Sequence, residues 1–361
     1  MRVSAEAIAS LLSRLFKAHG SQPGEAAEVA RHLVDSNLAG HDSHGVMRAP
    51  WYLEKVENGE IVPGAEFVVL QESETTATCD GNWGFGQPIA RQAMELAIAK
   101  ATSLSLACVT VKNCNHVGRL GAYTQLASRR GMIGIGMANL HGTSHCVAPF
   151  GGIDRKLPTN PLSVAFRRGQ PPDFLLDMTS SIVAEGKLKM KLNLGEPLPE
   201  GWAIDSEGRP AEWPRQFYDT PRGAIQPLGG SMGHKGFALS LAIDALAGAL
   251  SGAGCSSLKS TRHGNACLFL VMRIDAFCAV DEFEAKVDDL TSHVTRTRLA
   301  PGVEQVLIPG EPEHQAAARG RREGIEIDGE TWRQLGDWAA RAGESMDDMG
   351  VELARGDERN D

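Results

Sequence analysis

Segment 40–48, which reads G-H-D-S-H-G-V-M-R, carries side chains that together could bind and protonate an acid. If a helix begins with Asp42 as its N-cap, His44 and Arg48 stand at i and i+4 and share a face, with Ser43 beside them. Arginine binds a carboxylate through two hydrogen bonds, and histidine passes a proton near neutral pH. This pattern suits a small carboxylic acid. The alternative is a capped helix start in which His44 is hydrogen-bonded in the core and Arg48 forms a surface ion pair.

A second polar segment, 113–121, lies between a predicted strand and a predicted helix and contains Asn115 and His116. Ligands of α/β proteins gather where strands end and helices begin, because the amides of a helix N-terminus bind phosphate or other oxygen groups. The segment is therefore a candidate binding loop for a cofactor phosphate or a substrate oxygen. Capping of the helix by Asn115 and His116 is the alternative.

Two histidine pairs raise the question of a metal site. His41 and His44 are separated by two residues, and His141 and His145 by three. The second pair lacks the glutamate of the H-E-x-x-H motif, and Gly142 argues against a helix there. The sequence therefore predicts no metal site.

The string G-G-S-M-G at 229–233 matches G-x-S-x-G, in which Ser231 would be the nucleophile of a hydrolase. That motif needs a buried strand directly before it, and Pro221 and Pro227 make a poor central strand. A loop that continues through Lys235 into a helix fits a glycine-rich phosphate cradle better. A serine hydrolase stays the alternative enzyme class.

The G-x-G-x-x-G fingerprint of dinucleotide-binding Rossmann domains is not complete anywhere in the chain. Segments 84–86 and 134–136 each supply two of its glycines, and both lack the third. A Rossmann domain is therefore disfavoured, and a dinucleotide would have to be held by other loops.

The elements that must position these side chains alternate between helix and strand, which predicts an α/β fold. The predicted helices are 5–19, 23–39, a segment through 51–58, 88–101, a segment ending near 130, 283–298 and 331–342; the predicted strands are 67–70, 75–79, 106–111, 132–137, 162–166, 174–178 and 268–274. The apolar segment 237–253 contains Asp244 and many small residues, so we expect a buried helix and not a membrane span.

The composition indicates a soluble chain of 361 residues, 42% apolar and 22% charged, large enough for two or more lobes. A net charge of −9 provides no basic field, so nucleic acid and membrane are not expected as partners. Seven scattered cysteines without a C-x-x-C pair indicate a reducing compartment. Residues 1–17 read as an amphipathic helix without a cleavage site, so we expect no secretory signal.

Several motifs in order resemble the type 2 malate/L-lactate dehydrogenase family, which also includes ureidoglycolate, sulfolactate and cyclic-imine oxidoreductases. They are G-H-D-S-H-G-V at 40–46, N-H-V-G-R-L-G at 115–121, A-P-F-G-G at 148–152, T-N-P-L-S at 159–163, L-D-M-T-S at 176–180, G-W-A-I-D at 201–205, H-K-G-F-A-L at 234–239 and P-G-E at 309–311. The resemblance covers nearly the whole chain and looks closest to the bacterial hydroxycarboxylate dehydrogenase branch.

This resemblance implies a cytoplasmic, homodimeric 2-hydroxy acid dehydrogenase that uses NAD or NADP and acts on a small 2-oxo or 2-hydroxy acid. It also implies a non-Rossmann, mixed-sheet NAD(P)-binding domain beside a helical domain formed by both ends of the chain. The implied boundaries are 1–75 for the N-terminal substrate segment, 76–309 for the cofactor domain and 310–361 for C-terminal helices that pack on the first segment. A ligand-binding homologue without catalysis is the remaining alternative.

The resemblance also implies roles for individual residues. His44 and His116 match positions proposed as the proton donor or acceptor, Ser43 supports His44, Arg48 faces the substrate carboxylate, and Asn115 lies in the substrate-binding loop. Cofactor-binding segments contain Asn139, Thr159, Asn160, Pro161, Asp177, Met178, Thr179, Lys235, Gly236, Gly310 and Glu311. We favour His44 as the general acid, because a helix N-terminus at His116 disfavours the protonated imidazole.

Overall fold

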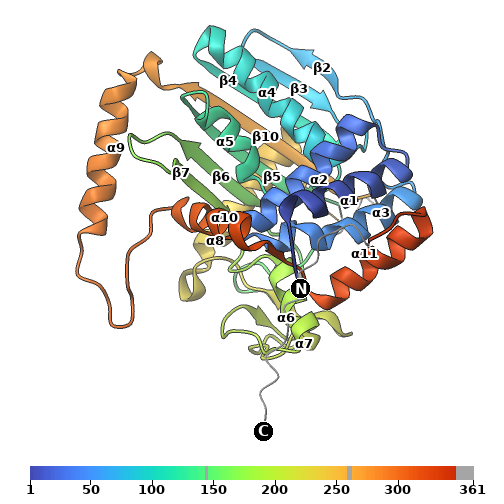
Figure 1. Ribbon diagram of the computed structural model, residues 1–361. Coiled ribbons are helices and arrows are strands. Elements are labelled where there is room, and N and C mark those ends of the chain that lie inside the picture. Colours follow the sequence, from blue (N-terminus) through green and yellow to red (C-terminus); the bar gives the residue numbers. More distant parts are fainter. Residues whose placement is uncertain (143–144, 258–261, 347–361) are drawn as a thin grey trace. The chain divides into compact units, whose positions relative to one another are not determined.

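The structure is a computed structural model that describes residues 1–142, 145–257 and 262–346. It divides into two units, of which unit 1 is Met1–Gly64 with Pro312–Asp361 and unit 2 is Ala65–Glu311. Unit 1 is mainly helical and is built from both ends of the chain, whereas unit 2 contains the large sheet (Figure 1).

A seven-stranded sheet forms the centre of unit 2 (Figure 1). In spatial order its strands are β2 (Val68–Glu72), β3 (Thr76–Asp80), β4 (Leu106–Cys114), β10 (Gly264–Arg273), β5 (Met132–His141), β6 (Pro161–Phe166) and β7 (Phe174–Thr179). β3 and β4 run parallel, and the other neighbouring pairs among these seven strands are antiparallel. The expected α/β class with a mixed sheet is confirmed.

Helices α4 (Gly86–Leu104) and α5 (Gly121–Ser128) cover one face of this sheet (Figure 1). Along α4, Ala93, Ala97 and Ala101 are fully buried at every fourth position. Small side chains at this spacing let the helix axis lie close to the strands, where alternate residues of β4 and β10 complete the core.

Strands β4 and β5 extend three and four residues beyond their predicted ends at 111 and 137. The added residues include Cys114 and Asn139, which pair with Asn265 and Ala266 of β10. The polar residues predict a loop here, because the local sequence does not reveal a partner strand more than a hundred residues away.

The apolar segment 237–253 is helical as far as Ala249, as predicted, but it is buried on one face only, so the expectation of a fully buried helix was wrong. Helix α8 (His234–Ile243) continues into a π-helical stretch, η4 (Asp244–Ala249), which turns Asp244 toward the sheet. The side chains of Leu246 and Leu250 therefore face solvent, and Leu250 is 60% exposed. Within the described residues, no helix has both the length and the hydropathy that a membrane crossing needs.

Unit 2 contains further elements that the sequence pattern did not predict: α6 (Glu185–Leu194), β8 (Ala203–Ile204), α7 (Arg215–Tyr218) and β9 (Ala224–Ile225). They enclose a small separate core around Phe217 and Ile225. The predicted helix 283–298 is α9 (Val280–Thr295), which stands beyond β7 at the margin of the sheet (Figure 1).

Unit 1 contains α1 (Ala5–Ala18), α2 (Pro23–Leu38), α3 (Ala49–Glu57), α10 (Glu311–Glu323) from its second residue, and α11 (Gly329–Ala342), with a short pair of strands, β1 (Arg2–Val3) and β11 (Ile325–Glu326). The predicted start of α1 is confirmed, since Ser4 Oγ accepts a hydrogen bond from the amide of Ala7 at 3.0 Å. Gly20 and Gly40 end α1 and α2 with positive φ angles of 93° and 77°, as predicted.

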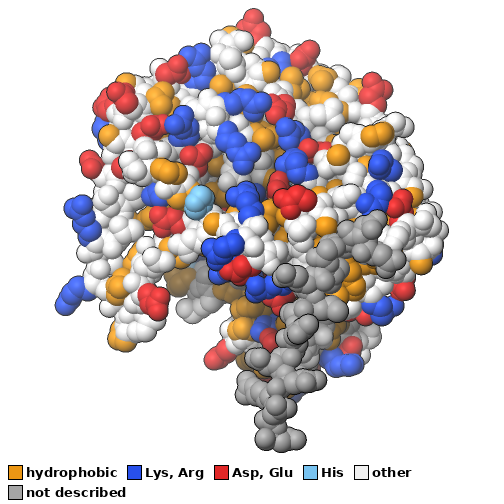
Figure 2. Space-filling view, viewed as in Figure 1, with side chains coloured by type: hydrophobic (Ala, Val, Ile, Leu, Met, Phe, Trp, Pro, Cys, Tyr) orange, Lys and Arg blue, Asp and Glu red, His pale blue; other side chains and the backbone are white. Residues whose placement is uncertain are grey.

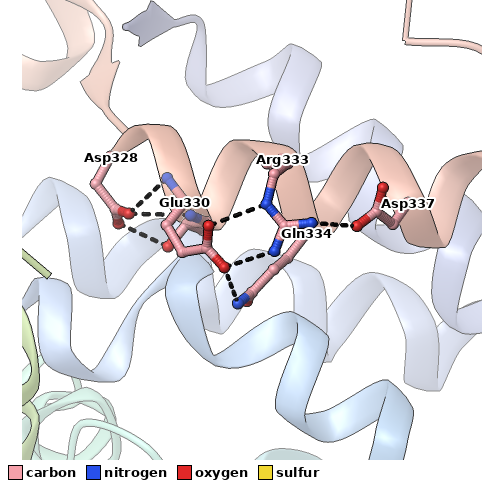
Figure 3. Close-up of polar contacts among 6 residues, drawn as sticks. Asp328, Glu330, Arg333, Gln334 and Asp337 are labelled. Atoms are coloured by element: carbon pink, nitrogen blue, oxygen red, sulfur yellow. Dashed lines mark hydrogen bonds and ion pairs between the residues drawn. The ribbon is translucent and has the colours of Figure 1, made fainter.

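Helix α11 begins at a side-chain cap, which Figure 3 shows together with the charges that follow it. The Asp328 carboxylate accepts hydrogen bonds from the amides of Glu330 and Thr331. One turn later Arg333 binds Glu330 and Asp337 on the exposed side of the helix. Exposed pairs of this kind contribute roughly 0.3–0.5 kcal/mol each, so the cap is the stronger determinant of where α11 starts.

We expect a side chain at Gly86 to destabilise unit 2. A Cβ there would lie 2.3 Å from the carbonyl oxygen of Asn115 and 2.4 Å from that of His116. Gly86→Ala should therefore lower the free energy of unfolding by about 1–3 kcal/mol, measured by denaturant unfolding. Gly24→Ala is the control, since nothing lies within 4 Å of its Cβ position, and a helical alanine there should be neutral or stabilising. Equal stability of the two variants would contradict this close approach.

Candidate functional site

Most of the predicted unit 2 site residues meet at one edge of the seven-stranded sheet. The parallel pair places the loops after β3 and β4 at this edge, and antiparallel pairing adds the ends of β5 and β7 and the starts of β6 and β10. The register pairs Cys114 with Asn265 and Pro161 with Thr179. We call this edge the polar edge; the predicted residues on it are Asn115, His116, Asn139, Thr159, Asn160, Pro161, Asp177, Met178 and Thr179.

Helix α8, which begins with the predicted residues Lys235 and Gly236, is tied to the polar edge. The amide of Asn160 donates to the carbonyl oxygen of Ser240 at 3.0 Å and to its Oγ at 3.2 Å. Lys235 is exposed, whereas Gly236 is buried at a point where a Cβ would lie 2.4 Å from the carbonyl oxygen of Leu228. The absence of a side chain at Gly236 therefore lets the glycine-rich loop pack against the start of α8.

Gly310 and Glu311 lie away from the polar edge. The backbone before them is bonded to the start of β7, where the Leu175 amide donates to the carbonyl oxygen of Pro309 at 3.1 Å. That position is about 13 Å along the strand from Thr179. Of the predicted cofactor residues, these two are thus not brought together with the others.

The loops after β3 and β4 are locked to each other by Asn115. Its side-chain amide donates to the carbonyl oxygens of Trp83 at 2.7 Å and Gly84 at 3.2 Å, and the side chain is buried. The backbone of His116 is held in the same way, since Gln87 Nε2 donates to its carbonyl oxygen at 3.1 Å. Asn115 therefore positions the half-buried His116 as part of a rigid loop.

Strained backbone is concentrated at the polar edge. Asn82, Trp83, Asn113 and Asn160 are non-glycine residues with φ angles of 47°, 62°, 54° and 27°. Such conformations persist only where the surrounding contacts enforce them, and they cluster at binding sites. The strain supports this edge as the place where a ligand is bound.

Asn139 holds three elements together at the polar edge. The residue is fully buried, and its amide donates to Asp244 Oδ1 of η4 at 2.7 Å. Its side-chain oxygen accepts from the Ala266 amide at 3.3 Å, and its carbonyl oxygen accepts from the Asn265 side chain at 2.7 Å. The side chain of this predicted cofactor residue is thus engaged within the protein.

Asp177 and Thr179 of β7 are also engaged within the protein. The carboxylate of Asp177 accepts a hydrogen bond at 2.7 Å from the amide of Gly121, at the start of α5. The hydroxyl of Thr179 donates to the carbonyl oxygen of Ser181 at 2.9 Å. Between them, Met178 is half-exposed.

Buried polar atoms near the polar edge that have no hydrogen-bond partner among the described residues include Asn160 Oδ1, His141 Nε2 and Ser256 Oγ. Asn160 is 1% exposed and His141 is 4% exposed. Leaving such an atom unsatisfied costs roughly 1–3 kcal/mol, so these atoms suit the polar groups of a bound molecule. A nicotinamide dinucleotide, which is rich in hydrogen-bonding groups, fits this set.

Segment 40–48 in unit 1 does not form one helix from Asp42, so the predicted i, i+4 arrangement is wrong. It forms two 3-10 turns, η1 (Asp42–His44) and η2 (Val46–Arg48), joined by Gly45 in an extended conformation. Asn37 causes this break, because its side chain donates to Asp42 Oδ1 at 2.6 Å and accepts from the Val46 amide at 2.7 Å. A Cβ at Gly45 would lie 2.1 Å from Asn37 Oδ1.

The predicted catalytic residues of unit 1 still share this tight segment. Arg48 Nε donates to the carbonyl oxygen of Ser43 at 2.7 Å, which folds the arginine back over the first turn. Ser43 is buried, while His44 and Arg48 are half-buried. These residues belong to unit 1, and Asn115 and His116 belong to unit 2.

The geometry around Ser231 does not resemble a nucleophile elbow. Ser231 lies in a 3-10 turn, η3 (Gly230–Met232), and the preceding strand β9 already ends at Ile225. An elbow requires a strand that runs directly into the serine. For metals, the described residues contain no group of three or more His, Cys, Asp and Glu side chains able to hold an ion.

Residues 3–336 match the family model described as malate/L-lactate dehydrogenase. The chain is 36% identical over 344 residues to the L-sulfolactate dehydrogenase of Methanocaldococcus jannaschii (94% of this chain, 96% of that one) and 31% identical over 349 residues to hydroxycarboxylate dehydrogenase B of Escherichia coli K12 (95% and 94%). The structure of malate dehydrogenase from Pyrococcus horikoshii OT3 matches with a TM-score of 0.86 at 32% identity, over 96% of each chain.

These similarities extend over nearly the whole chain, as the order of its motifs predicted, and they give the serine-hydrolase alternative no support. A dehydrogenase of this kind requires a nicotinamide cofactor, for which the polar edge provides unsatisfied polar atoms. The chain therefore belongs to the malate/L-lactate dehydrogenase family, which makes it a 2-hydroxy acid dehydrogenase.

Proposed function

We propose that this protein transfers hydride between NAD or NADP and the C2 carbon of a small 2-oxo or 2-hydroxy acid of the malate, lactate or sulfolactate type. The observation that carries the proposal is the polar edge, where strained loops and unsatisfied buried atoms coincide with the family's cofactor motifs. Substrates of this type follow from relatives named as malate, L-lactate and L-sulfolactate dehydrogenases.

The proposed division of work follows the domains that the sequence predicts. Segment 76–309 would bind the cofactor, and segments 1–75 and 310–361 would supply the helical substrate domain. The cofactor supplies the hydride, while the protein binds and orients both reactants and moves the proton. Asn139, Asp177 and Thr179 act by holding the polar edge rigid, and Asn160 offers its unsatisfied Oδ1 to the ligand. Thr159, Pro161, Met178, Lys235, Gly236, Gly310 and Glu311 remain proposed cofactor residues.

In the proposed mechanism Arg48 binds the substrate carboxylate through its terminal nitrogens while its Nε stays bonded to Ser43. His44, in the same tight turn, then donates a proton to the C2 oxygen as that oxygen gains charge during reduction, and Ser43 supports it. His116 polarises the substrate or orients the nicotinamide, and Asn115 fixes the loop that carries it.

We further propose a cytoplasmic homodimer. Helix α9 supports a second copy as partner, because none of its residues is buried although its apolar residues Phe283, Val287, Leu290 and Val294 follow a heptad-like spacing. Leu290 is 60% exposed. The segment after α9 also exposes Leu299, Val303, Val306 and Leu307, and Figure 2 shows hydrophobic atoms along it. A second chain would cover this stripe.

The activity is tested by mixing the protein with NADH or NADPH and a panel of 2-oxo acids and following cofactor absorbance. We expect oxidation with at least one acid, and a drop of about tenfold to a hundredfold in kcat/KM for Arg48→Lys, which keeps the charge and loses the planar two-donor geometry. A protein inactive with every acid but able to bind cofactor would be the ligand-binding homologue. Parent-like activity of Arg48→Lys and Arg48→Ala would remove Arg48 from the substrate site.

The pH profiles of two histidine variants distinguish the proposed proton donor from its alternative. His44→Asn should abolish the neutral-range titration of kcat along with most of the activity, because the general acid is lost. His116→Asn should slow turnover and leave that titration in place. The opposite outcome, an active His44→Asn enzyme that still titrates beside an inactive His116→Asn enzyme, would assign the proton to His116.

Charges placed on α9 should separate the subunits of the proposed dimer. Leu290→Asp combined with Val294→Asp would bury two carboxylates in the interface, so light scattering should report a monomer where the parent is a dimer. Asp289→Asn, exposed on the same helix, is the control and should stay dimeric. A parent protein that is monomeric, or a double variant that remains dimeric, would rule out this interface.

A further inference from the structure

His141 Nε2 and Ser256 Oγ are two buried polar atoms without a hydrogen-bond partner among the described residues, and they lie on segments that the backbone brings together. His141 is the last residue of β5, is 4% exposed, and has no hydrogen-bond partner for Nε2 among the described residues. Ser256 Oγ is shielded from solvent and is likewise unpartnered within that part of the chain. Neither side chain has a role in the proposed proton transfer.

Backbone contacts bring the two residues together. Gly142, directly after His141, forms a bridge with Ser256, and the Ser257 amide donates to the carbonyl oxygen of Gly142 at 3.2 Å. The Ser256 amide donates to the carboxylate of Asp244 at 3.1 Å, the same carboxylate that Asn139 binds. Because Asn139 and His141 are two residues apart in one strand, both side chains leave the sheet on the face that η4 covers.

Aromatic packing holds the imidazole of His141 in place. The ring of Trp83 contacts it edge-on, with centroids 5.8 Å apart, and the guanidinium of Arg262 lies 3.8 Å from the Trp83 centroid. Gly264 makes room for this arrangement, since a Cβ there would lie 2.8 Å from the Trp83 ring. The unsatisfied Nε2 is therefore fixed in position.

The pair is electrically neutral near pH 7. Burial lowers the pKa of His141, and the nearby His263 lowers it further, although Asp244 acts in the opposite direction. A neutral imidazole carries one donor and one acceptor nitrogen, and a serine hydroxyl serves as either. A group that both donates and accepts hydrogen bonds matches this pair better than a carboxylate, which only accepts.

We propose that His141 and Ser256 bind the carboxamide of the cofactor's nicotinamide ring. This inference rests on the proposed function. The carboxamide is the uncharged group among the two reactants that carries both N–H donors and a carbonyl acceptor on one carbon. Holding it limits rotation of the ring and so determines which ring face is presented to the substrate.

The test compares binding of NADH with binding of ADP-ribose, which lacks the nicotinamide, in the parent and in His141→Leu and Ser256→Ala. We expect each variant to weaken NADH about fivefold to tenfold, measured by cofactor fluorescence, and to leave ADP-ribose within about twofold, measured by calorimetry. If the parent prefers NADPH, that cofactor and 2′-phospho-ADP-ribose take their places. His314→Leu and Ser103→Ala, both at exposed positions on helices, are the matched controls.

A second arm uses 3-acetylpyridine adenine dinucleotide, in which a methyl group replaces the amide nitrogen. The parent should bind this analogue more weakly than NAD. This difference in affinity should shrink in whichever of His141→Leu and Ser256→Ala removes the side chain that accepts a hydrogen bond from the amide N–H group. Rescue of NADH affinity by His141→Gln, which restores a side-chain donor and acceptor, would support the same contact.

The remaining outcomes separate this inference from the proposed function. A parent that binds neither NADH nor NADPH would overturn both. A parent that binds NADH more tightly than ADP-ribose, with that difference unchanged in the variants, would overturn the carboxamide contact alone. Equal weakening of both ligands would also overturn it, because the two residues would then serve only the structure of the site.

Discussion

The buried hydrogen bond between Asn139 and Asp244 is the constraint on which the polar edge depends. A carboxylate that is 4% exposed is costly unless it is fully hydrogen-bonded, and Asp244 is satisfied by Asn139 and by the Ser256 amide. These bonds require η4 to turn Asp244 toward the sheet. With η4 turned in this way, the side chains of Leu246 and Leu250 face solvent, and Ser256 lies beside the end of β5.

Asparagine side chains hold the loops and strand termini of the polar edge in one rigid arrangement. The asparagine amide both donates and accepts, so Asn115, Asn160 and Asn265 satisfy backbone groups where the regular ladder stops. Asparagine also tolerates positive φ better than other side chains, as Asn113 and Asn160 require. Loops held in this way lose little further conformational entropy on binding, and the edge is therefore preorganised for a ligand.

Local signals predicted the parts of the fold that local interactions determine. The cap at Ser4 and the glycines after α1 and α2 were sufficient to place those helices. The ends of β4 and β5 were missed because their polar residues are satisfied by distant partners, Asn139 by a carboxylate 105 positions later. The arrangement at 40–48 failed for a similar reason, since the side chain of Asn37 breaks the expected helix.

For the candidate site, too, the sequence does not contain the information that distant contacts supply. Family motifs located the polar edge, but they did not distinguish residues that build it from residues that face a ligand. Asn139 and Asp177 lie in such motifs and have their polar groups engaged within the protein, whereas Asn160 keeps an unsatisfied oxygen. His141 lies outside the matched motifs and keeps an unsatisfied nitrogen. Unsatisfied buried atoms depend on three-dimensional packing, so they point to candidate ligand contacts that spacing along the sequence does not reveal.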